Sequence, residues 1–314
     1  MESDTLVDGV LNIIKPPGMT SFDVVAFLRR LLGTKKIGHA GTLDPLAVGV
    51  LPVFTGRATK AIEYFMEKDK LYRVELTLGT STDTQDSSGN VIKAGCIEAS
   101  PEEIKKVIYS FLGEYEQVPP MYSAVRYNGK KLYELARNGI EIERKPRKVH
   151  IHFINMLDFR YLKVKESDNI DNYNSARAII DVFCSKGTYI RTLCHDIGEA
   201  LGCGGYMSFL LRLEAGVFNL PEAWTLEEII EMRSQNRISE AMVSIDKLFT
   251  EYPCVVLNEK EYKRFMNGAV VNVATGSHKT GLTKVYDNNK SFVALGRLYY
   301  SENGCFLKSE KFFT

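Results

Sequence analysis

The sequence lacks any apolar run close to the roughly 18 residues that a membrane-spanning helix needs. Its first residues, MESDTLVDGVLN, carry acids where a secretory signal would carry a basic and then an apolar segment. The six cysteines are scattered without a CxxC pair, so neither a disulfide framework nor a zinc site is indicated. A P-loop and a Rossmann fingerprint are also missing. We therefore expect a protein of the reducing cytoplasm that has no membrane segment and no metal.

Excess charge is missing as well, because the 314 residues carry a formal net charge of only +1. This balance argues against a protein that coats nucleic acid, but it leaves room for a local basic groove. Residues 126–148 hold eight Lys or Arg and three Glu, with Tyr127 and Tyr133 interleaved. Such a stretch suits an arm that follows phosphates. Taken alone, however, a solvated charged helix and loop is the favoured explanation.

The sequence contains a mixture of helix and strand patterns without regular βαβ spacing. Residues 71–78 alternate as a strand does, and residues 100–113 form the clearest helix, with a capping box at its start. The mixture predicts an α+β fold whose mixed or antiparallel sheet is flanked by helices. Farther along the chain, short β-like runs alternate with turn signals. We therefore expect a first domain at residues 1–240 and a small β-rich module at residues 241–314.

One loop combines an ionisable residue with an apolar run. In GHAGTLDPLAVGVLPVF, at residues 38–54, Asp44 stands at the mouth of a segment that must pack as a buried strand. A partly desolvated carboxylate needs a cation or a hydrogen-bond donor, or it takes up a proton. The alternative is an ordinary turn, since Asp before Pro often bonds only its own backbone.

Three other residues could act beside such a carboxylate. Arg191 falls in the first turn of a predicted helix, where the macrodipole disfavours a cation, so it is a candidate partner for Asp44. Tyr72 lies on the apolar face of its strand and could stack on a base. His39 stands on a glycine-rich loop and could contact nucleic acid. Their ordinary alternatives are a solvated arginine, a core tyrosine and a structural histidine.

Two polar segments carry weaker signals. KPPGMTS, at residues 15–21, places Lys15 on a rigid loop before a helix N-terminus, a position that suits phosphate. TSTDTQDSSGN, at residues 80–90, contains Asp83 and Asp86, but turn chemistry explains it fully and it lacks a calcium-binding pattern.

Six segments together resemble a known family. They are NIIKPPGMTS, GHAGTLDPLAVGVLPV, KLYRVELTLGTSTDTQDSSG, QVPPMYSAV, GTYIRTLCHDIGEALG and FLLRLEAG. Their order and rough spacing, from residue 9 to about residue 235, are similar to those of the TruB family of pseudouridine synthases. The tail, from NGAVVNVATG to FVALGRL, resembles a PUA RNA-binding domain over a shorter stretch.

The resemblance implies roles for individual residues. Asp44 matches the family's catalytic aspartate, and Arg191 matches the arginine that pairs with it. Tyr72 matches the tyrosine that stacks on the target base and takes part in proton removal at C5. His39 matches a histidine tied to flipping the base, and residues 126–148 match an inserted arm that clasps tRNA. Other positions match residues that line the uridine pocket or lie near the site or the RNA: Tyr189, Leu210, Lys15, Lys60, Asp83, Thr84, Arg126, Lys130, Lys131, Lys145 and Lys148.

Two positions depart from the family's pattern. Val48 stands where the family commonly has Thr or Ser, which changes the packing behind the loop. Arg126 stands where Lys is usual, which keeps the charge but changes the donor geometry.

The implied reaction is the isomerisation of uridine to pseudouridine at position 55, in the T-loop of tRNA. By the resemblance, a monomer performs it without cofactor, metal or guide RNA, after the base leaves its stack. Three alternatives stay open: a guide-RNA-dependent relative, a non-catalytic RNA-binding or tRNA-folding protein, and a nucleoside hydrolase. The basic arm disfavours the first, and the lack of a clear second carboxylate near Asp44 disfavours the last.

Overall fold

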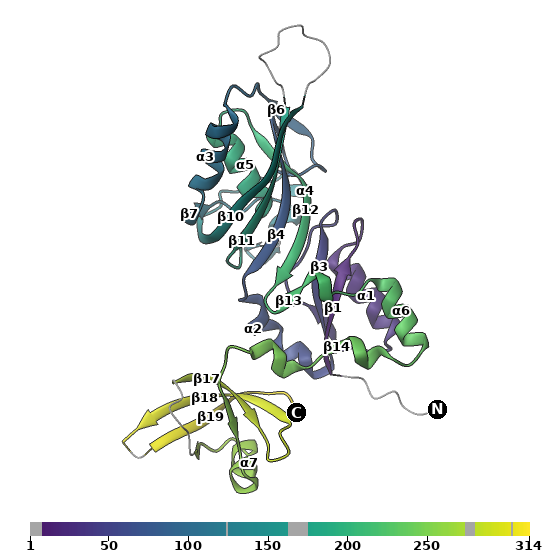
Figure 1. Ribbon diagram of the computed structural model, residues 1–314, viewed down its shortest axis with the longest axis vertical. Coiled ribbons are helices and arrows are strands. Elements are labelled where there is room, and N and C mark those ends of the chain that lie inside the picture. The colour runs from purple at the N-terminus through teal and green to yellow at the C-terminus, as the bar shows by residue number, and fades with distance from the viewer. Residues whose placement is uncertain (1–7, 124, 163–174, 274–279, 303) are drawn as a thin grey trace.

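The structure is a computed structural model, and it describes residues 8–123, 125–162, 175–273, 280–302 and 304–314 (Figure 1). Its main feature is a ten-stranded sheet with the order β14-β1-β3-β12-β4-β11-β10-β7, while β2 and β13 pair at its side. The strands of this sheet are β1 (Gly9–Lys15), β2 (Ile37–His39), β3 (Val48–Thr55), β4 (Lys70–Leu78), β7 (Gly113–Gln117), β10 (Arg147–Leu162), β11 (Ser175–Cys184), β12 (Gly205–Ala215), β13 (Phe218–Asn219) and β14 (Met242–Val243). β12 is parallel to β3 and antiparallel to β4, so the sheet is mixed.

The predicted strand at residues 71–78 lies at the centre of this sheet. In β4, Val74, Leu76 and Leu78 are fully buried on one face, as the alternation predicts. The other face carries Arg73, which forms an ion pair with Asp181 of β11 at 2.8 Å. The buried face is therefore the one on which a site can be enclosed.

Helices cover the sheet in two groups. α3 (Pro101–Ser110) and α5 (Ile190–Ala200) lie beside β4, β11 and β10, and α1 (Ser21–Leu31) and α6 (Leu226–Ser234) lie beside β1 and β3 (Figure 1). Each group packs on its own apolar cluster. Capping boxes start α1, α3 and α6, as the sequence predicts for α3.

The segment at residues 56–66 is less regular than a single helix. It forms a 3-10 helix, η1 (Gly56–Ala61), followed by the short α2 (Ile62–Met66). The Thr59 hydroxyl donates to the Gly56 carbonyl at 2.7 Å, a local bond that competes with regular α-helical pairing. This segment lies under β3 and contacts the C-terminal part of the chain.

The C-terminal part forms a separate five-stranded sheet with the order β15-β17-β18-β19-β16. Its elements are β15 (Cys254–Val256), α7 (Glu259–Met266), β16 (Val271–Asn272), β17 (Gly281–Tyr286), β18 (Phe292–Ser301) and β19 (Gly304–Phe312). It lies below the large sheet in Figure 1. The predicted division at residue 240 falls just before β14, which still pairs with β1. The α+β class, the mixed sheet and the β-rich C-terminal module are confirmed.

The basic stretch is an excursion between β7 and β10. It contains the two-stranded pair β8 (Arg126–Tyr127) and β9 (Lys130–Lys131) and the short helix α4 (Leu132–Arg137). The end of the stretch differs from the expectation, because Arg147 and Lys148 already pair with β7 inside the large sheet. A two-stranded pair, β5 (Thr80–Thr82) with β6 (Val91–Ala94), projects near α5. Within the described ranges, no helix is long and apolar enough to cross a membrane.

Candidate active site

Lys15 fixes the loop that carries Asp44. The Lys15 ammonium is fully buried and donates to the carbonyls of Pro16 at 2.8 Å, Met19 at 2.6 Å and Pro45 at 3.0 Å. Burial lowers the pKa of Lys15 to about 8, and the charge of Asp44 opposes this effect. The Lys15 ammonium therefore bonds backbone carbonyl groups around the loop and is not free to bind a phosphate.

A second anchor comes from the start of α1. The Ser21 hydroxyl accepts from the backbone N–H of Leu43 at 2.9 Å and lies 3.2 Å from the carbonyl oxygen of the same residue. With Lys15, this contact places Asp44 where β3 begins, as the sequence predicts.

Arg191 and Asp44 form the central ion pair of the site. The Arg191 Nε atom lies 2.9 Å from Asp44 Oδ2, and its Nη2 atom lies 3.3 Å from Asp44 Oδ1. The Arg191 side chain is only 7% exposed, whereas the Asp44 side chain is 36% exposed. The guanidinium is thus enclosed, and one side of the carboxylate faces the open pocket.

Asp86, which the sequence predicts only as a turn residue, completes this cluster. Its Oδ2 atom lies 3.5 Å from Arg191 Nη1, while its Oδ1 atom accepts from the Thr84 hydroxyl at 2.7 Å and the Ser88 N–H at 2.9 Å. Arg191 also donates to the carbonyl of Thr84 at 3.2 Å and to that of Tyr122 at 2.8 Å. The guanidinium therefore joins the Asp44 loop, the 84–88 loop and the base of the basic arm.

The electrostatics of Asp44 reflect two opposing effects. Burial raises the pKa of the Asp44 carboxyl, and the neighbouring Asp86 adds to the rise. Arg191 and, more weakly, Lys15 lower it. The carboxylate is thus poorly hydrated but paired, a state that suits a nucleophile.

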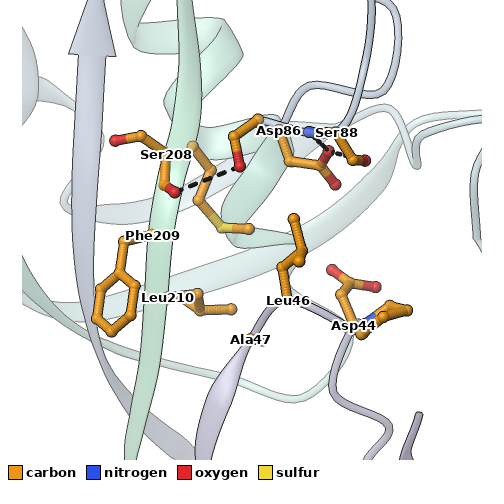
Figure 2. Close-up of a pocket in the computed structure, with 11 residues that line it drawn as sticks. Asp44, Leu46, Ala47, Asp86, Ser88, Ser208, Phe209 and Leu210 are labelled. Carbon is orange, nitrogen blue, oxygen red and sulfur yellow. Dashed lines mark hydrogen bonds between the residues drawn. The ribbon is translucent and has the colours of Figure 1, made fainter. Parts of the chain in front are cut away.

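A pocket with an empty volume of about 450 Å³ opens beside this carboxylate. It is lined by the Asp44 loop, the 86–88 loop and β12 residues from Met207 to Leu210. Figure 2 shows Asp44 and Asp86 facing the same space, with Leu46 and Leu210 as apolar neighbours. The mixture of apolar walls with a partly exposed carboxylate suits a planar polar ring such as a nucleobase.

Tyr72 stands on β4 with its ring half-buried against the apolar cluster under α3 and α5. Its cross-strand partner is Arg212 of β12. Burial raises the pKa of the Tyr72 hydroxyl, and the charge of Arg212 opposes the rise. Asp44 also influences this pKa, so the two residues are electrostatic neighbours.

The remaining predicted pocket residues take several positions. Tyr189 is the N-cap residue of α5, and its backbone N–H and carbonyl both bond the side chain of Gln117. His39 is half-buried on β2, and burial lowers its pKa. Asp83 accepts from the N–H of Asn90 at 2.9 Å. Of the predicted pocket and RNA-contacting residues, the described contacts bring only Thr84 and Leu210 directly to the Asp44–Arg191 cluster or to the pocket.

Lys60 lies elsewhere. Its ammonium donates to the carbonyls of Phe312 at 2.9 Å and Thr314 at 3.5 Å, so it holds the end of the chain and not the Asp44 loop. The resemblance implies a position near the site or the RNA for Lys60. Its described contacts lie with the C-terminal end of the chain, and a role near the RNA stays a prediction.

Lysines of the basic arm are available to solvent. Lys130, Lys145 and Lys148 are exposed, and Lys148 lies 3.8 Å from Glu114 in an exposed ion pair. The side chains of Arg126 and Lys131 lie outside the described residues. No cluster of three or more metal-binding side chains occurs within the described part of the chain.

Sequence comparison identifies two family models along the chain. "TruB family pseudouridylate synthase (N terminal domain)" matches residues 29–190, and "tRNA pseudouridylate synthase B C-terminal domain" matches residues 191–250. The five-stranded sheet, which begins at Cys254, lies beyond both matches.

Curated relatives extend the similarity over most of the chain. A protein from Alkaliphilus oremlandii named tRNA pseudouridine synthase B is 46% identical over 83% of this chain and 82% of its own length. A protein of the same name from Caldanaerobacter subterraneus subsp. tengcongensis is 44% identical over 92% of this chain and 95% of its own length.

Solved structures show the same fold. A chain from "Structure of H/ACA RNP bound to a substrate RNA containing 2'-deoxyuridine" has a TM-score of 0.70 and 25% identity, over 98% of this chain and 85% of that one. A chain from "Crystal Structure of a Cbf5-Nop10-Gar1 Complex" has a TM-score of 0.69 and 26% identity, with the same coverage.

Proposed function

This chain belongs to the TruB family of pseudouridylate synthases, and on that premise we propose that it isomerises uridine to pseudouridine at position 55 of tRNA. Asp44 is the nucleophile, Tyr72 the base-stacking residue and Arg191 the partner of the carboxylate. The observation that carries this proposal is the partly exposed Asp44 carboxylate, which pairs with the buried Arg191 and lines a pocket with apolar walls.

The reaction needs the target base outside its stack, because a duplex or folded loop hides the atoms that react. The N1–C1′ bond breaks, the uracil turns, and a C5–C1′ bond forms. The C5 proton then leaves and N1 gains a proton, so the product has the same composition as the substrate. No electrons or groups enter, and the proposed reaction uses no cofactor or metal.

In this proposal the residues of the site have different roles. A carboxylate beside C1′ acts as glycosidase carboxylates do, and Arg191 opposes the rise in the pKa of Asp44 that burial causes. Leu210 lines the pocket and provides apolar surface for the uracil, and Tyr72 packs on the apolar cluster to which Leu210 belongs. Stacking of one base on an aromatic ring contributes about 1–3 kcal/mol.

We also propose the partners. The exposed lysines of the arm bind tRNA phosphates, and residues 241–314 form a PUA-like RNA-binding domain beside a catalytic domain at residues 1–240. The enzyme acts as a cytoplasmic monomer without a guide RNA. Relatives named tRNA pseudouridine synthase B at 44–46% identity support this choice over the H/ACA proteins at 25–26%.

The proposal is tested with purified protein and an unmodified tRNA transcript in the absence of any other RNA. After digestion, chromatography of the nucleosides should show pseudouridine and no free uracil, and replacing uridine 55 by cytidine should abolish the product. Free uracil would indicate a nucleoside hydrolase. Tight binding with unchanged nucleosides would indicate a guide-dependent enzyme or a non-catalytic RNA-binding protein, and it would overturn the proposal.

A further inference from the structure

Arg212 is a buried arginine directly beside Tyr72. Its side chain is 1% exposed, and it is among the largest fully buried side chains of the described residues. Arg212 and Tyr72 are cross-strand partners in the antiparallel pair of β12 and β4, so both side chains point to the same face of the sheet. This register makes the Arg212 guanidinium and the Tyr72 hydroxyl electrostatic neighbours, and Tyr72 acts on the pKa of Arg212.

Within the described residues, the hydrogen bonds of Arg212 go to neutral carbonyl groups. Its Nε atom donates to the Val50 carbonyl at 2.6 Å, and Nη2 donates to the Gly41 carbonyl at 3.0 Å. Among the ion pairs found over the described ranges, none joins Arg212 to a carboxylate. A buried cation without an anion is costly, so this charge needs a reason.

Neighbouring charges make the position more unusual. The ammonium of Lys70 and the half-buried His39 lie close enough to Arg212 for its charge to lower their pKa values, after burial as the larger cause. Lys70 itself donates to the Met66 carbonyl at 3.1 Å, again a neutral partner. Among the described residues, the Tyr72 hydroxyl is the acidic group that opposes the lowering of the Arg212 pKa by burial.

The groups around Tyr72 act on the pKa of its hydroxyl in opposite directions. Burial raises the pKa of its hydroxyl, and the charges of Cys184 on β11 and Asp44 on its loop raise it further. Arg212 is the group that works in the opposite direction, because its positive charge lowers the pKa of the Tyr72 hydroxyl. An ionised Tyr72 would therefore find its counter-ion already in place.

We propose that Arg212 is a positioning residue that stabilises the phenolate of Tyr72, which takes the C5 proton of the target uracil. This inference rests on the proposed function. Once the C5–C1′ bond has formed, the phenolate oxygen accepts the C5 proton, and the electrons of the C5–H bond restore the C5–C6 double bond. The electrons of the C6–N1 double bond move to N1, which takes a proton from solvent. The phenol then returns its proton to solvent, so no other reactant is needed. The bond to Gly41 ties this base to the start of the Asp44 loop.

Single-turnover rates of pseudouridine formation, measured against pH with saturating tRNA, test the inference. In Arg212→Gln, loss of the cation makes Tyr72 harder to ionise. The limb of the rate–pH profile that rises toward alkaline pH should therefore move to higher pH. At neutral pH the rate should fall by about 100-fold, the low end of the range for a positioned proton-transfer group. Arg212→Lys keeps the charge and should recover part of both effects. Tyr72→Phe should lose the limb, and adding Arg212→Gln to it should change little more.

Arg73→Gln is the matched control, because Arg73 adjoins Tyr72 in β4 but pairs with Asp181 on the opposite face. Arg73→Gln should leave the alkaline limb of the rate–pH profile at the same pH as in the wild type. Thermal unfolding and the tRNA Kd identify variants that fail for reasons of folding or binding.

A second measurement keeps Arg212 intact. Replacing the tyrosines by 3-fluorotyrosine lowers the phenol pKa and should move the limb to lower pH. Arg212 variants that lose rate equally at every pH, or a limb unmoved by fluorotyrosine, would show a purely structural arginine. If the wild-type protein forms no pseudouridine at all, it is instead the proposed function that fails.

Discussion

Replacing Arg191 by alanine removes the only cation that forms an ion pair with Asp44 among the described residues. Truncating one partner of a buried pair costs about 3–5 kcal/mol. Because the Asp44 side chain is 36% exposed and water can reach one side of it, we expect the lower end, about 3 kcal/mol. If that loss falls on the transition state, the single-turnover rate should drop by about 100-fold.

The sign of the pH effect follows from the same contacts. Burial already raises the pKa of Asp44, and Arg191 is the largest opposing influence. Without Arg191 the carboxyl keeps its proton to higher pH, so the acidic limb of the rate profile should move upward. The defect of Arg191→Ala should therefore be largest in acid and should shrink as the pH rises.

The assay is single-turnover pseudouridine formation with saturating tRNA, from about pH 5 to about pH 9. Arg73→Ala is a matched control, because it removes an arginine with a bidentate carboxylate contact on the opposite face of the same sheet. A rate for Arg191→Ala within about twofold of the wild type, with the acidic limb unmoved, would refute the reasoning.

Three further predictions concern packing, charge and RNA binding. A Cβ on Gly198 would lie 2.1 Å from the backbone nitrogen of the facing β12 strand, so Gly198→Ala should lower the free energy of unfolding by about 3 kcal/mol, measured in urea. Burial raises the pKa of the Asp196 carboxyl from 3.8 to about 6, so the folded state favours the protonated carboxyl. Asp196→Asn should therefore raise the free energy of unfolding by about 1–2 kcal/mol above pH 6 and leave it unchanged below pH 3.8. Thermal unfolding across this pH range measures the change. Replacing Lys130, Lys145 and Lys148 by Gln should weaken tRNA binding and flatten the slope of log Kd against log salt by about 0.7–0.9 per lost phosphate contact; an unchanged slope would mean that the arm does not touch phosphate.

The features that were predictable from the sequence are those whose causes are local. The capping box at Ser100 and the alternation from Tyr72 to Leu78 involve neighbours in the chain, and both elements form where expected. Asp44 at the mouth of a buried strand and Arg191 in the first turn of a helix were also visible. An unfavourable local position predicted a partner for Arg191, and the structure supplies it.

The features that were missed depend on contacts between distant segments. Asp86 looked fully explained by its turn, and its contact with Arg191 spans 105 residues. No pattern in the sequence indicated a role for Arg212, because its pairing with Tyr72 exists only through the register of β12 on β4. Lys60 has its hydrogen-bonding partners at the other end of the chain. No periodicity or spacing encodes such pairs.

The central claim is that the protein isomerises a uridine of tRNA with Asp44 as its catalytic residue. The most direct measurement is tritium release from a tRNA transcript labelled at uridine C5, with wild type, Asp44→Asn and the exposed control Asp158→Asn compared side by side. The account predicts release of the label from the single target uridine by wild type and Asp158→Asn, and none by Asp44→Asn, although that variant still binds tRNA. Undiminished release by Asp44→Asn would contradict it.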